Sequence, residues 1–165
     1  MKTRATKILA AIILTIVFCA VGINYRFERF NRGTLALKTG DYQTALNNLR
    51  PLASWGDRNA QFILAQMYAY GLGVERDAAV AFQWLSRADA KRATGEAYVI
   101  AKNYIDGAPE TKPDQREAVK WFRIAAENGS REAAKILGDA YTNGLLGLPK
   151  DSKEAERWLN TAPGR

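Results

Sequence analysis

The chain has 165 residues, 47% hydrophobic and 25% charged, a balance that suits one globular domain with a packed core. It has no histidine and one cysteine, Cys19, which excludes histidine-containing metal sites, histidine general bases and intramolecular disulfides. The net charge is +7, but residues 1–32 hold six basic side chains and one acidic, so +2 remains for the rest. A surface with so little excess positive charge is not expected to bind nucleic acid.

The N-terminus contains an uninterrupted apolar run of 16 residues, from Ile8 to Ile23, which predicts a segment that meets a membrane. Its length lies between about 7 to 15 residues for the core of a cleaved signal peptide and about 17 to 25 for a spanning helix. Cleavage would place Ala20 and Gly22 in the small-residue positions before the cut. Lipidation of Cys19 is not expected, because the large Phe18 precedes it.

The flanks of this run favour an uncleaved anchor, the interpretation adopted for residues 1–30. Tyr25 and Phe27 suit the membrane interface, and Arg26 and Arg29 can extend their charged ends to it. Three basic side chains precede the run, so the positive-inside rule places the N-terminus in the cytoplasm. In a bacterial cell the protein would be single-pass in the inner membrane, with its solenoid in the periplasm. The alternative is a cleaved, periplasmic protein.

After the anchor, residues 31–57 predict a degenerate opening pair of helices. Asp41 follows a glycine and caps a helix that carries Ala45 and Leu49. Pro51 falls inside this helix, where the missing backbone N–H predicts a bend.

The stretch from Asn59 to Ala88 is the clearest unit of the chain. Its first part, from Ala60 to Tyr68, has apolar residues at helical spacing around Leu64. Gly71 then ends the helix, since glycine enters the left-handed conformation without a steric penalty. Asp77 precedes a run of helix formers and predicts the N-cap of a second helix.

Two further copies of this unit follow, at offsets of 36 or 37 residues. Each copy repeats a tyrosine, a glycine, an aspartate and an alanine-tryptophan-alanine series in register. These residues are Tyr68, Gly71, Asp77, Ala81, Trp84 and Ala88, then Tyr104, Gly107, Asp114, Ala118, Trp121 and Ala125, then Tyr141, Gly144, Asp151, Ala155, Trp158 and Ala162. The tryptophans lie between small residues on one helix face and are predicted to belong to the core. Glutamates three residues after the later aspartates, Glu117 and Glu154, predict capping boxes.

At these positions the chain resembles the Sel1-like repeat family, which is related to tetratricopeptide repeats. The match is fullest from Ala60 to Ala88, where Ala65 replaces the glycine usual in the pattern. The resemblance implies an all-α solenoid of helix-turn-helix repeats. The run of helical pairs joined by glycine turns predicts seven or eight solenoid helices and a separate N-terminal one. The expected repeats are residues 31–57, 58–92, 93–129 and 130–162. The resemblance implies protein–protein interaction and does not imply catalysis.

No constellation of catalytic residues is visible in the sequence. The four serines lack the S-x-x-K spacing that would provide a lysine base, and no cofactor or metal is expected. The preferred interpretation is a non-catalytic scaffold in the bacterial cell envelope, tethered to the membrane, that binds a protein or peptide partner. One alternative is an exported enzyme or regulator that acts on cell-wall material. Another is a passive subunit that packs against a membrane protein through residues 8–23.

A candidate binding surface follows from helical geometry. With Leu64 at the centre of the buried stripe and about 100° per residue, Phe62 and Gln66 lie on the far side of the first helix. Together with the equivalent positions in the later copies they form what we name the inner-face track. Those equivalents are Tyr98, Lys102, Lys135 and Asp139. Aromatic side chains are good anchors for a partner. The alternative is that Phe62 and Tyr98 only pack between neighbouring first helices.

Overall fold

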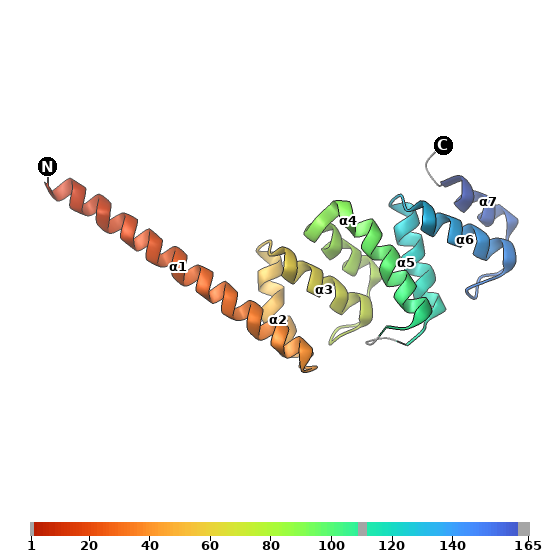
Figure 1. The fold of residues 1–165 in the computed structure, drawn as a ribbon, viewed down its shortest axis with the longest axis horizontal. Coiled ribbons are helices and arrows are strands. Elements are labelled where there is room, and N and C mark those ends of the chain that lie inside the picture. The colour runs from red at the N-terminus through yellow and green to blue at the C-terminus, as the bar shows by residue number, and fades with distance from the viewer. Residues whose placement is uncertain (1, 109–111, 162–165) are drawn as a thin grey trace.

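The computed structural model describes residues 2–108 and 112–161, with side chains from residue 12 onward except those of residues 18 and 19. Seven α-helices and no β-strand are present in these residues, so the predicted all-helical fold is confirmed. The helices, shown in Figure 1, are α1 (Lys2–Lys38), α2 (Tyr42–Ser54), α3 (Arg58–Tyr70), α4 (Ala78–Asp106), α5 (Gln115–Glu127), α6 (Arg131–Asn143) and α7 (Ser152–Thr161).

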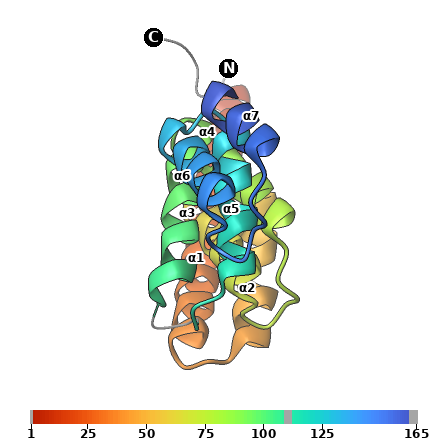
Figure 2. The same cartoon turned by 90° about the vertical axis from the view of Figure 1, so that its right-hand side faces the viewer.

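The helices stack in chain order as a solenoid. Each helix contacts the next one along the chain, and α5 also contacts α7. Figure 1 shows the stack advancing from α2 to α7 while most of α1 extends away from it, and Figure 2 shows the same stack viewed from the α7 end. Contacts that run mainly between neighbours along the chain are the defining property of repeat arrays.

Helix α4 consists of two solenoid helices joined at Asp89. The backbone of Asp89 is non-helical, with φ −160° and ψ 97°, so the chain changes direction there. We refer to residues 78–88 as the first arm of α4 and to residues 90–106 as its second arm. The helical pairs are the end of α1 with α2, α3 with the first arm, the second arm with α5, and α6 with α7. The described residues therefore form eight solenoid helices, in agreement with the predicted seven or eight.

The sequence predicts a separate N-terminal helix, but α1 is continuous from Lys2 to Lys38, and its end is the first solenoid helix. The prediction of a separate helix is wrong because no proline interrupts this stretch, and its two glycines, Gly22 and Gly33, do not end the helix. Gly33 lies where α1 meets α2: an added Cβ would be 2.7 Å from Cγ of Leu49. Gly33 thus permits close packing of the two helices. The predicted divisions at residue 30 and between the repeats stay predictions.

The outer part of α1 projects from the solenoid (Figure 1). Its described apolar side chains are exposed, among them Ile12, Leu14 and Ile23. Within the part of the chain that the structure describes, no helix is both long enough and apolar enough to cross a membrane. Residues 8–11, 18 and 19 of the predicted apolar run lie outside the residues whose side chains are described. The predicted transmembrane helix therefore has no support from the described residues.

Arg29 joins α1 to α2 at the position of Pro51. Proline has no backbone N–H, so the carbonyl oxygen of Asn47, four residues earlier in α2, lacks its usual helical donor. Arg29 supplies one: its Nη2 donates to the Asn47 carbonyl at 2.9 Å, and its Nη1 to the Tyr25 hydroxyl at 2.9 Å. Helix α2 continues through Pro51 to Ser54. The Arg29 contact helps to fix the direction of α1 relative to the solenoid.

The glycine turns and aspartate caps form as predicted. Gly71 and Gly144 end their helices in the left-handed conformation, with φ of 75° and 72°. The carboxylates of Asp77, Asp114 and Asp151 accept hydrogen bonds from backbone N–H groups in the first turns of α4, α5 and α7. Local chemistry at these positions therefore sets where each helix begins and ends.

The predicted capping boxes are only half formed. Glu117 and Glu154 do not reach back to the capping aspartates but pair with Lys120 at 2.6 Å and with Arg157 at 3.2 Å. The backbone N–H of each capping aspartate donates at 2.8 to 3.0 Å to the carbonyl oxygen of the repeat tyrosine, namely Tyr68, Tyr104 or Tyr141. The reciprocal bond of a capping box is replaced because the tyrosine carbonyl already satisfies that N–H.

The core is divided into two clusters, a larger one formed mainly by α3 to α7 and a smaller one formed by α1 to α3. Trp121 and Trp158 are buried in the larger cluster, with 0% and 3% of their surface exposed, as predicted. Trp84 is only partly buried and packs against both clusters, with the Arg87 guanidinium 4.8 Å from its ring. Its indole therefore connects the two clusters rather than filling one of them.

Candidate protein-interaction surface

The six residues of the inner-face track lie on the first helices of three successive repeats. Phe62 and Gln66 belong to α3 and are half-buried. The equivalents on the second arm of α4 are half-buried as well, whereas those on α6 are exposed. They are Tyr98 and Lys102, and then Lys135 and Asp139. Binding of a partner by this track stays a prediction.

The aromatic members of the track also contribute to packing within the solenoid. Phe62 and Tyr98 both pack against the larger core cluster. The Tyr98 ring meets Phe122 of α5, with ring centroids 5.8 Å apart and an angle of 61° between the ring planes. Lys102 forms an ion pair with Asp106 at 3.5 Å. Packing, the alternative expected for Phe62 and Tyr98, therefore accounts for part of their surface.

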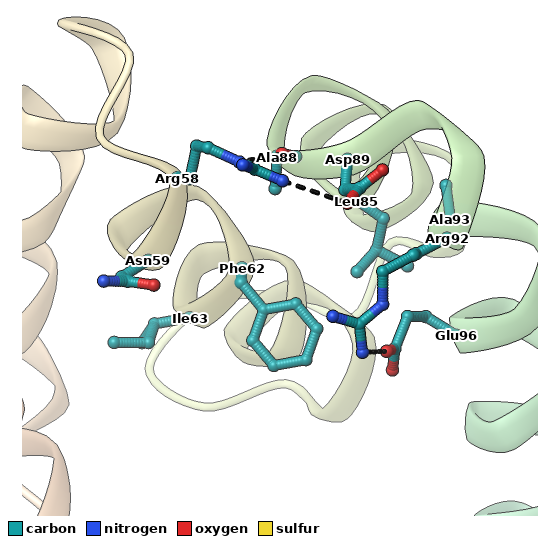
Figure 3. Close-up of a pocket in the computed structure, with 10 residues that line it drawn as sticks. All are labelled: Arg58, Asn59, Phe62, Ile63, Leu85, Ala88, Asp89, Arg92, Ala93 and Glu96. Atoms are coloured by element: carbon teal, nitrogen blue, oxygen red, sulfur yellow. Dashed lines mark hydrogen bonds and ion pairs between the residues drawn. The ribbon is translucent and has the colours of Figure 1, made fainter.

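A pocket of about 560 Å³, open to solvent, lies between α3 and the two arms of α4 (Figure 3). Its apolar lining includes Phe62 and Ile63 from α3 and Leu85 from the first arm. Charged residues at the start of α3, at the bend in α4 and on its second arm complete it. We name this the α3/α4 pocket. In it Phe62, a member of the inner-face track, lies beside charged side chains.

The α3/α4 pocket exists because the second arm of α4 has an extra helical turn. In α3 and α6 the N-cap residue, Asp57 or Ser130, lies eleven residues before the repeat tyrosine. In the second arm the capping residue is Asp89, which lies fifteen residues before Tyr104. The four additional residues form about one turn of helix. This turn carries Arg92 to the wall of the pocket, across from Phe62 of α3.

Two arginines line the α3/α4 pocket, and they are held differently. Arg58 donates from Nε to the carbonyl oxygen of Ala88 at 2.8 Å and from Nη2 to the Asp89 carboxylate at 2.9 Å. It therefore caps the end of the first arm at the bend. Arg92 forms one ion pair, with Glu96 at 3.4 Å. Both arginine side chains are exposed, by 69% and 74%, but Arg58 is held by two bonds and Arg92 by one.

The repeat pattern did not identify the charged residues of this pocket, since Arg58, Arg92 and Glu96 are not among the recurring positions. One signal in the sequence could have indicated them. Gly56 and Gly129 precede the first helices α3 and α6, whereas no glycine separates Ala88 from the second arm of α4. A missing glycine at that point indicates that helix replaces the loop.

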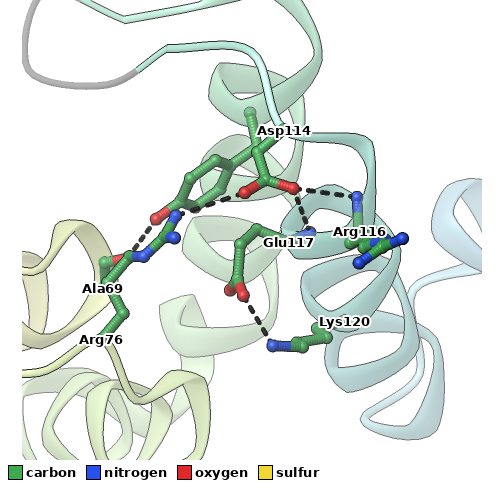
Figure 4. Close-up of polar contacts among 7 residues, drawn as sticks. Ala69, Arg76, Asp114, Arg116, Glu117 and Lys120 are labelled. Carbon is green, nitrogen blue, oxygen red and sulfur yellow. Dashed lines mark hydrogen bonds and ion pairs between the residues drawn. The ribbon is translucent and has the colours of Figure 1, made fainter.

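Polar contacts join neighbouring repeats at the loops between paired helices (Figure 4). Arg76, in the loop after α3, lies 3.4 Å from the carboxylate of Asp114, the N-cap of α5. The Tyr104 hydroxyl donates to the carbonyl oxygen of Ala69. Hydrogen bonding from the backbone N–H of Glu117 is the main cause that lowers the pKa of Asp114. These contacts connect the loop of one repeat with the cap of the next.

A second pocket, of about 550 Å³, lies against the last helix and includes Ser152, Glu156 and Leu159. It is at the end of the solenoid and also includes Thr142 of α6. Among residues 12–17, 20–108 and 112–161, no group of three or more cysteine, aspartate or glutamate side chains is placed to hold a metal ion.

Stacked helical pairs with glycine turns, aspartate caps and core tryptophans define a solenoid of tetratricopeptide-like repeats. The sequence profile of the Sel1 repeat matches residues 58–88, 97–130 and 131–162, more than half of the chain. The protein therefore belongs to the Sel1 repeat family, whose members are protein-interaction scaffolds. The family resemblance predicted from the sequence is confirmed.

Similar proteins come from fungi and bacteria. Chitin synthase regulatory factor 3 of Schizosaccharomyces pombe is 30% identical over 132 residues, which are 79% of this chain and 13% of that protein. Chitin synthase regulator SKT5 of Saccharomyces cerevisiae is 30% identical over 135 residues, which are 78% of this chain and 19% of that protein. An uncharacterised protein of Neisseria meningitidis is 33% identical over 105 residues, 63% of this chain and 21% of that one. The chain thus spans about a fifth or less of the length of these relatives.

Two solved structures are also similar. A Sel1 repeat protein from Oxalobacter formigenes is 30% identical, with a TM-score of 0.43, and the match covers 79% of this chain and 53% of that one. The protective antigen c5321 of uropathogenic Escherichia coli is 34% identical, with a TM-score of 0.42, and the match covers 72% of this chain and 25% of that one.

Proposed function

We propose that this protein is a non-catalytic scaffold that holds a protein partner on the surface of its solenoid and is tethered to a membrane by α1. Membership of the Sel1 repeat family supports the scaffold role. The observation that carries the proposal for this chain is the α3/α4 pocket, which joins apolar and charged side chains next to the inner-face track. Partner surfaces combine apolar anchors with polar groups in this way.

The membrane tether is proposed from the apolar run of residues 8–23 and from the exposure of α1. The solenoid has its own core and no place for a helix that is apolar on every side. All described side chains of residues 12–17 and 20–27 are exposed, including large apolar ones such as Leu14 and Phe27. Exposed apolar surface of this extent marks an interaction with a membrane or a protein. The other six side chains of the run, those of residues 8–11, 18 and 19, lie outside the side chains that the structure describes.

The proposed location is the inner membrane of a bacterial cell, with the solenoid in the periplasm. The basic residues before the apolar run, Lys2, Arg4 and Lys7, favour a cytoplasmic N-terminus. Cleavage after the run is the alternative and would release a periplasmic protein. If the anchor is retained, the continuous α1 and its bond from Arg29 to α2 would hold the solenoid near the membrane surface.

Site-specific photo-crosslinking in cells tests the scaffold. A crosslinking amino acid replaces Gln66 or Asp139 on the inner-face track, and Gln83 or Lys120, exposed on second helices, in the matched controls. We expect one and the same protein to be crosslinked from both track positions and from neither control. Crosslinking from the control positions alone, or from none of the four, would contradict the proposal.

Reporter fusions test the tether and its direction. Alkaline phosphatase or a fluorescent protein that matures only in the cytoplasm is fused to the C-terminus, and cells are separated into membrane and soluble fractions. The proposal expects active phosphatase, no fluorescence and full-length protein in the membrane fraction. A soluble protein that lacks residues 1–22 would establish cleavage, and bright fluorescence would overturn the periplasmic location.

A regulator of cell-wall polysaccharide synthesis is a second candidate, because two of the relatives are named as chitin synthase regulators. The chain corresponds only to a small part of those proteins, so it would act by bringing a synthase together with another protein. Incorporation of a labelled cell-wall precursor in a deletion strain tests this candidate. Unchanged incorporation would remove it and leave the scaffold proposal intact.

A further inference from the structure

We infer that the α3/α4 pocket receives a segment of the partner protein in which a large apolar side chain stands next to an aspartate or glutamate. The inference rests on the proposed scaffold function and adds the chemistry of the partner at one site. The acidic residue lies within a chain rather than at its end, because the pocket, whose lining Figure 3 shows, is open to solvent.

The apolar half of the pocket accounts for the large side chain. Phe62 and Ile63 of α3 and Leu85 of the first arm form this half. In Figure 3 the Phe62 ring points toward the second arm of α4, across from Arg92 and Glu96. Phe62 is half-buried, so part of its ring is open to be covered by a ligand. The volume of about 560 Å³ lies within the range of about 300 to 1,000 Å³ typical of ligand pockets.

The charged half of the pocket favours an anionic group over a cationic one. The two carboxylate oxygens of Asp89 already accept hydrogen bonds, one from Arg58 and one from the backbone N–H of Lys91. Glu96 is paired with Arg92 through Oε1. These carboxylates are also less exposed than their partners: 32% of Asp89 and 25% of Glu96 is exposed, against 69% of Arg58 and 74% of Arg92, so a ligand meets mainly the cationic groups.

Arg92 has the donors that a carboxylate needs. A guanidinium carries five N–H groups in a planar fork, and Arg92 directs Nη2 at Glu96. The other edge of the fork can bind a second carboxylate with two parallel hydrogen bonds while Glu96 keeps its place. Arg92 stands on the extra turn, beside the apolar wall formed by Phe62. A side chain packed on Phe62 and a carboxylate bound to Arg92 must therefore be neighbours in the partner.

The test measures the binding of synthetic peptides to the full chain in detergent micelles by fluorescence anisotropy. The reference peptide has a Leu-Glu pair in a glycine and serine background and an amidated C-terminus. Matched peptides contain Leu-Gln, Leu-Lys or Ala-Glu instead. A further peptide contains Leu-Gln and ends in leucine with a free carboxylate, so that the chain end is its only anion. We expect the Leu-Glu peptide to bind at least about tenfold more tightly than each of the others, a difference of about 1.4 kcal/mol.

Two charge-reversal variants assign the preference to the pocket. Arg92→Glu should abolish the preference for Leu-Glu and strengthen binding of the Leu-Lys peptide. Lys91→Glu makes the same change in charge at a neighbouring exposed position that does not line the pocket, and should keep the preference. Circular dichroism checks that both variants are folded. The peptide series on the wild-type chain tests the preference for Leu-Glu even if a variant does not fold.

Equal binding of the Leu-Glu, Leu-Gln and Ala-Glu peptides, or no measurable binding of any peptide, would overturn the inference. A preference that survives Arg92→Glu would do so as well. Tightest binding of the peptide with the free C-terminus would assign the pocket to a chain end, against the occupant inferred here. If crosslinks from Gln66 and Asp139 persist while the peptides fail, only the inference fails. Loss of those crosslinks means that the proposed scaffold function fails.

Discussion

At two places the chain passes from the second helix of one repeat to the first helix of the next: at the junction between α5 and α6, and at the bend in α4. These two connections use different lengths of chain. Asn128, Gly129 and Ser130 separate α5 from α6, and Gly129 is left-handed with φ 99°. In α4 only Asp89 departs from helical geometry. The spacing between successive repeat tyrosines is almost the same across both connections, 36 and 37 residues. At the bend, the residues that would otherwise form a loop therefore lengthen the second arm of α4. The extension produces the α3/α4 pocket. Loop length, rather than the recurring residues, thus distinguishes one joint of the array from another.

The largest expected difference between the two joints lies in their tryptophans. Trp121, before the glycine turn, is fully buried, whereas Trp84, before the bend, is partly buried between the two core clusters. Trp121→Ala should lower the free energy of unfolding by about 3 to 5 kcal/mol, the usual cost of removing a core aromatic. Trp84→Ala should cost clearly less, because part of the ring is already in water. Urea denaturation followed by circular dichroism measures both, and equal costs would show that the two positions are packed alike.

The sequence predicted most of the array because local chemistry determines it. Gly71 ends α3 through its backbone freedom, and Asp77 begins α4 through its carboxylate, and neither depends on distant contacts. The α3/α4 pocket could not be predicted in the same way, since Arg58 and Arg92 line one pocket only after the chain bends at Asp89. The continuity of α1 was also missed, because the role of Gly33 depends on how closely α2 approaches it.

Removal of the N-caps should show a smaller difference between the two joints. Ser130 accepts a bond from the backbone N–H of Ala133, so Ser130→Ala should cost about 1 kcal/mol in stability. Asp89 caps the second arm through Lys91 and also holds Arg58. Asp89→Ala should therefore cost more, about 1 to 2 kcal/mol. Urea denaturation of the two variants is the measurement, and Asp89→Asn, which keeps a cap but loses the charge, separates the two contributions of Asp89.

Helices α1 and α2, which are joined by a turn at Gly40, are also held together by a side chain. Arg29→Ala removes the donor to the carbonyl of Asn47 and should cost about 1 kcal/mol. Pro51→Ala restores a backbone N–H that can bond to the same carbonyl. Arg29→Ala should therefore cost less in the Pro51→Ala background, and a double-mutant cycle measures the coupling. Strict additivity of the two substitutions would mean that Arg29 does not replace the missing proline donor.

The smallest expected effect concerns the cap of α5, the helix that leads into the glycine turn. The backbone N–H of Glu117 is the first cause that lowers the pKa of Asp114, and the nearby Arg76 adds to it. Because the folded-state pKa is below the unfolded one, ionised Asp114 stabilises the fold above about pH 4. This stabilisation is lost as the pH falls through the folded-state pKa.

Asp114→Asn keeps a capping side chain but not the charge, so it should cost a few tenths of a kcal/mol to about 1 kcal/mol at pH 7. At a pH below the folded-state value, where Asp114 is protonated, wild type and variant should approach equal stability. Urea denaturation at both pH values measures the difference, and a gap of the same size at both would show that the charge of Asp114 does not stabilise α5.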